Sequence, residues 1–158
     1  MDHSAASLTL SQTASVEAAT GILAGTTLLT LDGELPVEFL TPGDRVITRS
    51  GVRVLAQVTG RAVSDFAAVE ILPGTLGHDR PGQALVIGAD QMVLVRDWRA
   101  QALYGAAQAL VPAHRLADGH YIRRVTLAQA QVFTLTFTAG ETVYAEGVEL
   151  GFPAAVPA

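Results

Sequence analysis

The chain has 158 residues and a formal net charge of −5, with 49% hydrophobic and 16% charged residues, which is the composition of one folded domain. Its ten cationic side chains are all Arg and are scattered along the chain, so it lacks the basic stripe that nucleic-acid binding requires. Because it contains neither Cys nor Lys, disulfides, thiolate metal sites, P-loop lysines and Schiff-base chemistry are excluded.

The first twenty residues lack the basic start and compact apolar stretch of a Sec signal peptide. No apolar run reaches the roughly 18–20 residues of a membrane-spanning helix. We therefore expect no membrane segment, and a location in the cytoplasm or outside the cell by a non-Sec route. Residues 1–20 are predicted to form a flanking arm that covers a site or pairs with another copy, residues 21–152 one domain, and residues 153–158 a frayed tail.

Alternation of apolar and polar residues begins at Thr26 and predicts short antiparallel strands. Asp32-Gly33 and Ser50-Gly51 are predicted turns. Thr41-Pro42-Gly43-Asp44 has the composition of a type II turn. The predicted strands are 26–31, 34–39, 45–49, 52–59, 69–72, 83–87, 92–95, 121–127, 132–138 and 142–145.

Helical periodicity is weak throughout the chain. The alanines of residues 99–109 favour a helix, but Gly105 interrupts them, so at most a short helix is expected there. Residues 114–116 are predicted to form a single helical turn. The sequence thus predicts an all-β domain.

Several short motifs follow one another in a fixed order across residues 21–152. They are Gly25-Thr26, the segment 36–46, Gly74-Thr75-Leu76-Gly77, Leu110-Val111-Pro112-Ala113 and Ala145-Glu146-Gly147. In this order they resemble the bacterial type of Hint (Hedgehog/intein) domain. The resemblance implies a compact all-β fold of short antiparallel strands and hairpins, with at most one or two short helices.

The resemblance also implies a self-processing site, in which a Cys, Ser or Thr attacks the preceding peptide bond while a Thr and a His polarise it. The nucleophile position, four residues before Gly25, is occupied by Gly21. The family's Ser/Thr-x-x-His block falls on Gly88-Ala89-Asp90-Gln91. Its later His-x-x-x-Asp-x-His pattern falls on Thr134, Thr138 and Gly140. Intein-type release also requires an Asn, and this sequence has none.

Of the implied processing residues, only Asp90 is retained. Glutamine cannot act as a base at ordinary pH, and glycine has no nucleophile. We therefore expect a degenerate Hint-like domain that has lost self-processing and acts as a binding or structural module, with another protein, its own arm or a second copy as partner. Two alternatives remain: residual autoproteolysis of the Thr20–Gly21 bond with help from Asp90, and small-ligand binding in the former active-site cleft.

The remaining polar residues support simpler roles. His3, His78, His114 and His120 are not spaced to converge on a metal ion, so no metal and no cofactor are predicted. Asp90 is also interpreted as a turn residue between two strands.

Overall fold

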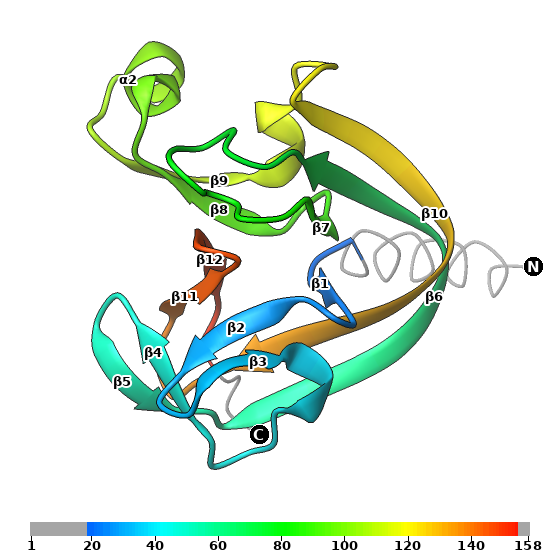
Figure 1. Ribbon diagram of the computed structural model, residues 1–158, viewed down its shortest axis with the longest axis vertical. Helices are drawn as coiled ribbons and strands as arrows, with labels where there is room; N and C mark the ends of the chain where they lie inside the picture. Colours follow the sequence, from blue (N-terminus) through cyan, green and yellow to red (C-terminus); the bar gives the residue numbers. More distant parts are fainter. Residues whose placement is uncertain (1–18, 155–158) are drawn as a thin grey trace, which may run out of the picture.

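Two long antiparallel strands, β6 (Gln57–Ile71) and β10 (Ile122–Thr136), form the curved ribbon that organises the molecule (Figure 1). Their pairing runs from Ile71 opposite Ile122 to Gln57 opposite Thr136. The computed structural model describes residues 19–154, so most of the predicted arm and residues 155–158 lie outside the described residues.

The ribbon closes into a small barrel with two short strands, β1 (Ile22–Leu23) and β7 (Leu85–Gly88), in the order β1-β10-β6-β7. Ile22 pairs with Phe133 of β10 on one side and with Ile87 of β7 on the other. The short β1 therefore completes the barrel and fixes where the preceding residues, 19–21, must lie.

A second sheet packs beside the barrel in the order β3-β2-β4-β11-β12-β8-β9, with β5 paired to β4. One continuous core of buried side chains joins the two sheets: Ile22 and Ile87 come from the barrel, and Leu28, Val46 and Leu150 from the second sheet. The strands of this sheet are β2 (Thr27–Thr30), β3 (Gly33–Pro36), β4 (Arg45–Thr48), β5 (Gly51–Val54), β8 (Met92–Val95), β9 (Ala109–Pro112), β11 (Glu141–Ala145) and β12 (Val148–Phe152).

Helices are few and short, as predicted. The helix α2 (Trp98–Tyr104) begins after Asp97, whose carboxylate accepts a hydrogen bond from the Arg99 N–H at 3.0 Å. It ends at Gly105, whose φ of 65° is the left-handed conformation that terminates many helices. The 3₁₀ helices are η1 (Val37–Phe39) and η2 (Ala113–Leu116). None of the helices in the described part of the chain is long and apolar enough to cross a membrane. The predicted all-β class is confirmed.

Two of the tight hairpins, β2–β3 and β4–β5, share a Thr-x-x-Gly sequence. In each, the first Thr pairs with the Gly, which places Leu31-Asp32 and Arg49-Ser50 in the loops rather than the predicted Asp32-Gly33 and Ser50-Gly51. The Thr30 hydroxyl donates to the Gly33 carbonyl at 2.7 Å, and the Thr48 hydroxyl donates to the Gly51 carbonyl at 2.7 Å. These hydrogen bonds satisfy the loop backbone and shift each turn by one residue.

The predicted strands differ from the structure in several places. Residues 57–71 form the single strand β6 and residues 122–136 the single strand β10, where two separate strands were predicted in each region. Residues 37–39 belong to η1 rather than to β3, and β1, β9 and β12 were not predicted. The middle of the ribbon is largely exposed, so its residues show no apolar alternation. At the other end, Ala154 forms a parallel bridge with Phe137, so strand-type pairing continues beyond residue 152.

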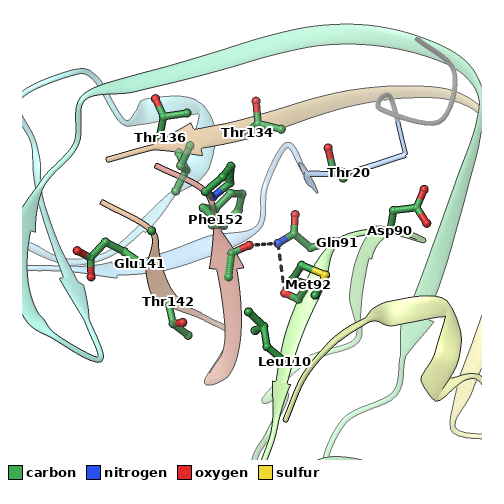
Figure 2. Close-up of a pocket in the computed structure, with 14 residues that line it drawn as sticks. Thr20, Asp90, Gln91, Met92, Leu110, Thr134, Thr136, Glu141, Thr142 and Phe152 are labelled. Carbon is green, nitrogen blue, oxygen red and sulfur yellow. Dashed lines mark hydrogen bonds between the residues drawn. The ribbon is translucent and has the colours of Figure 1, made fainter. Parts of the chain in front are cut away.

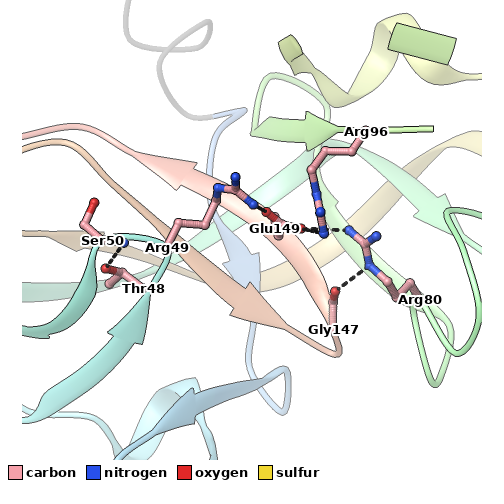
Figure 3. A network of polar contacts seen from close by, with 7 residues as sticks. All are labelled: Thr48, Arg49, Ser50, Arg80, Arg96, Gly147 and Glu149. Atoms are coloured by element: carbon pink, nitrogen blue, oxygen red, sulfur yellow. Dashed lines mark hydrogen bonds and ion pairs between the residues drawn. The ribbon is translucent and has the colours of Figure 1, made fainter. Parts of the chain in front are cut away.

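A fully buried carboxylate in β12, Glu149, ties three loops to the second sheet (Figure 3). Arg49 contacts it at 2.6 Å from the β4–β5 hairpin, and Arg80 at 3.0 Å from the loop before β7. Arg96, which follows β8, contacts the same carboxylate. Since the carboxylate is buried and each guanidinium is partly exposed, the cluster depends on Glu149 more than on any one arginine.

We expect Glu149→Gln to lower the free energy of unfolding by about 3 kcal/mol, because it leaves three guanidinium groups without their shared counter-charge. Glu70→Gln is the matched control: it breaks the more exposed Glu70–Arg123 pair and should cost less than about 1 kcal/mol. Urea denaturation followed by circular dichroism measures both. A loss at Glu149 no larger than that at Glu70 would contradict the role given to this cluster.

Candidate functional site

The backbone of residues 19–21 lies against the end of β7 and the turn that follows it. The Gly88 N–H donates to the Gly21 carbonyl at 2.8 Å, and the Asp90 N–H donates to the Ala19 carbonyl at 3.0 Å. These two bonds continue the β1–β7 pairing beyond Ile22. The Thr20–Gly21 peptide bond is therefore held between backbone groups on one side and β10 on the other.

Gln91 is buried beneath this peptide bond and all its polar atoms are engaged (Figure 2). Its Oε1 accepts the Gly21 N–H at 3.0 Å, while its Nε2 donates to the Gly151 carbonyl at 2.8 Å and to the Met92 carbonyl at 3.3 Å. Because one partner is a backbone donor and the others are acceptors, the orientation of the amide is fixed. The side chain thus presents an acceptor, not an acid, to the amide nitrogen of Gly21.

Two glycines leave no space for side chains at this junction. A Cβ on Gly21 would lie 2.6 Å from Val132 Cγ1 and 2.8 Å from the Phe133 carbonyl oxygen, at a φ of +118°. A Cβ on Gly88 would lie 2.1 Å from the carbonyl oxygen of Ala19. All three distances are below what real Cβ atoms show, so neighbouring atoms leave no room for a side chain at either position.

The Thr20 carbonyl is contacted by a residue that sequence reasoning missed. The guanidinium of Arg61, on β6, donates to it at 3.0 Å. Burial lowers the pKa of Arg61 from its ordinary value, but a guanidinium remains charged at physiological pH. The arginine therefore polarises this carbonyl. A single Arg within a polar stretch gave no sequence signal for this contact.

Asp90 lies in the turn between β7 and β8, as predicted. Its carboxylate lies 3.5 Å from His114 Nε2, and Figure 2 shows it directed away from Thr20. Both side chains are about one third exposed. In this arrangement the carboxylate does not face the Thr20–Gly21 bond.

The three positions of the later family pattern separate in space. Thr134 and Gly140 line a cavity of about 740 Å³ that begins beside Thr20, whereas Thr138 is exposed and does not line it. The cavity wall also contains Thr136, whose hydroxyl is buried without a hydrogen-bond partner among residues 19–154. The further lining residues are Asp90, Gln91, Met92, Leu110, Leu135, Glu141, Thr142, Gly151, Phe152 and Pro153.

Within the described part of the chain, no three His, Asp or Glu side chains are placed together to hold a metal ion. Asp90 and His114 are a pair without a third ligand.

Comparison with known proteins identifies the family. A family model described as Hint domain matches residues 20–151, which is most of the chain. The chain belongs to the Hint domain family. None of the curated proteins matches the sequence.

Solved structures share the fold at low sequence identity. An intein-like domain from Clostridium thermocellum is 15% identical, with a TM-score of 0.57 over 85% of this chain and 98% of that one. A DnaB intein from Synechocystis sp. is 13% identical, with a TM-score of 0.55 over 87% of this chain and all of that one. The Hint and intein fold predicted from the motifs is confirmed, and at these identities the likeness extends to fold alone.

We expect Gly88→Ala in this Hint domain to lower the free energy of unfolding by about 2 kcal/mol, because the Ala19 backbone must move to admit the Cβ. Gly82→Ala is the control, since its Cβ would meet nothing closer than 3.8 Å and should change stability by less than about 0.5 kcal/mol. Chemical denaturation of both variants checks this. Equal stability of the two variants would mean that residues 19–21 do not pack against Gly88.

Proposed function

We propose that this Hint domain has lost self-processing and acts as a binding or structural module. The observation that carries the proposal is the contact between the Gly21 N–H and Gln91 Oε1 at 3.0 Å, in a junction with no room for side chains at Gly21 or Gly88. Acyl transfer needs a nucleophile next to the carbonyl and a proton donor for the departing amine.

The nucleophile is the first missing group. Gly21 carries no side chain, and one added there would collide with Val132 and the Phe133 backbone. The carbonyl before it keeps one favourable feature, the hydrogen bond from Arg61 at 3.0 Å. Polarisation of a carbonyl assists cleavage only when an atom is placed to attack it, so this hydrogen bond does not by itself break the peptide bond.

The acid is the second missing group. The amide nitrogen of Gly21 must gain a proton before it can leave, and the side chain that faces it accepts a hydrogen bond instead. Gln91 cannot exchange roles, because its amide nitrogen already donates to Gly151 and Met92. These contacts support the proposal that Thr20 and Gly21 are joined by an ordinary peptide bond that is not cleaved.

Residual hydrolysis of the Thr20–Gly21 bond is the competing proposal. It would use the Arg61-polarised carbonyl and water activated by Asp90. The Asp90 carboxylate points away from Thr20 and contacts His114 at 3.5 Å, which argues against it as the base. The two proposals differ in whether the purified chain changes mass.

We expect the purified chain to keep one unchanged mass over several days at neutral pH, with or without hydroxylamine or a thiol to capture an ester. Intact-mass spectrometry is the measurement, and Asp90→Ala is the paired variant. A fragment that begins at Gly21 would contradict the proposal, and its disappearance in Asp90→Ala would establish the residual hydrolysis instead.

The cavity beside Thr20 supports ligand binding as a second candidate function. Its volume of about 740 Å³ lies within the range of small-molecule sites. Thr136 is one of its lining residues, but the hydroxyl of this side chain is itself buried and has no partner among the described residues. A buried hydroxyl without a partner costs free energy in the protein itself.

We expect Thr136→Val to raise the free energy of unfolding of the unliganded protein by about 1 kcal/mol, because a methyl group replaces an unsatisfied buried hydroxyl. Thr126→Val, at an exposed position of the same strand, should change stability by less than about 0.5 kcal/mol. Thermal and urea denaturation compare the two. Destabilisation by Thr136→Val would contradict this expectation and would mean that the hydroxyl is already satisfied.

A further inference from the structure

A second hollow, separate from the cavity beside Thr20, lies between α2, η2 and the start of β10. It has a volume of about 480 Å³ and is lined by Leu103, Tyr104, His114, Arg115 and Arg124. Figure 1 shows α2 and η2 on the same side of the molecule, with β10 beginning next to η2. None of its five lining residues lines the cavity beside Thr20.

The charge of this hollow is opposite to that of the protein. The chain carries a net charge of −5, yet no carboxylate lines the hollow, and two guanidinium groups do. Most arginines of this chain contact a carboxylate: Arg49, Arg80 and Arg96 contact Glu149, Arg53 contacts Glu141, Arg99 contacts Asp97, and Arg123 contacts Glu70. Arg115 and Arg124 have no carboxylate partner within residues 19–154, so their donors are available.

The other lining side chains extend the same site. His114 offers an imidazole whose charged neighbour, Asp90, lies at 3.5 Å and outside the hollow. Leu103 and Tyr104 are 54% and 40% exposed, and they provide an apolar surface that ends in a phenol hydroxyl. The C-terminus of α2 brings partial negative charge near the hollow. The carbonyls of Ala100 and Gln101 accept hydrogen bonds from Ala106 and Gly105, and the two guanidinium groups oppose the charge of the remaining carbonyls.

We propose that this hollow binds a small organic phosphate, with the phosphate between Arg115 and Arg124 and its apolar or aromatic part on Leu103 and Tyr104. Guanidinium groups match the oxygen geometry of a phosphate and form charge-assisted hydrogen bonds with it. The apolar surface next to them distinguishes an organic phosphate from inorganic phosphate. This proposal goes beyond the loss of self-processing and does not depend on it.

Phenyl phosphate is the probe, titrated at low salt into the full chain labelled with ¹⁵N and followed by NMR. Shifts are expected at the amides of residues 103–104, 114–115 and 124, with affinity about fivefold or more above that for inorganic phosphate. Arg115→Gln and Arg124→Gln should each weaken binding about tenfold without changing the melting temperature, because each removes a charged donor from an exposed position.

Arg45→Gln is the matched control, because Arg45 is also exposed and has no carboxylate partner in the described chain, but lies on β4 outside the hollow. It should bind phenyl phosphate as the unmodified protein does. Equal loss in all three variants, or unchanged binding in Arg115→Gln and Arg124→Gln, would overturn the site. Equal affinity for phenyl phosphate and inorganic phosphate would overturn the role given to Leu103 and Tyr104.

Discussion

The closure of this molecule depends on backbone meeting backbone at the Thr20–Gly21 junction. Gly88 has no side chain, so the Ala19 carbonyl can approach β7; a Cβ on Gly88 would lie 2.1 Å from that carbonyl oxygen. Likewise, the absence of a side chain on Gly21 lets it approach Val132 and Phe133 of β10. The hydrogen bonds from Gly88 and Asp90 to residues 19–21 follow from this approach, and they place β1 between β7 and β10. In this chain the close approach of β1 to β7 and β10 leaves room only for glycine at both positions.

The same contacts bear on the proposed loss of self-processing in this Hint domain. A self-processing site must keep a nucleophile, an acid and room for a substrate carbonyl to move. In this chain the space for the first is filled by neighbouring atoms, and Gln91 engages both the Gly21 N–H and the Gly151 carbonyl. Gln91 therefore links β1 to β12. The Gln91 hydrogen bonds that would impair catalysis also hold the two sheets together.

The sequence predicted the class of fold because alternation and turn residues are local patterns. The resemblance to Hint domains, carried by short motifs in order, was what assigned Gly21, Gly88 and Gln91 to one site, although they lie far apart in the chain. Two contacts could not be predicted. Arg61 reaches the Thr20 carbonyl because of the register of β6 with β10, which the sequence does not reveal. Glu149 lies in β12, a strand whose charged residue and glycine gave no apolar alternation to predict it. Thr138, which the resemblance placed among the site residues, is exposed and lies outside the cavity.

Amide hydrogen exchange, followed by NMR residue by residue, tests the closed junction most directly. The account predicts that the Gly21, Gly88 and Asp90 amides exchange as slowly as amides inside the β6–β10 ribbon, because each donates within a packed junction. Gln91→Ala should speed exchange at Gly21 far more than at the interior of the ribbon. Exchange of all three amides at the rate of exposed loops in the unmodified protein would contradict the account, because the junction would then be open.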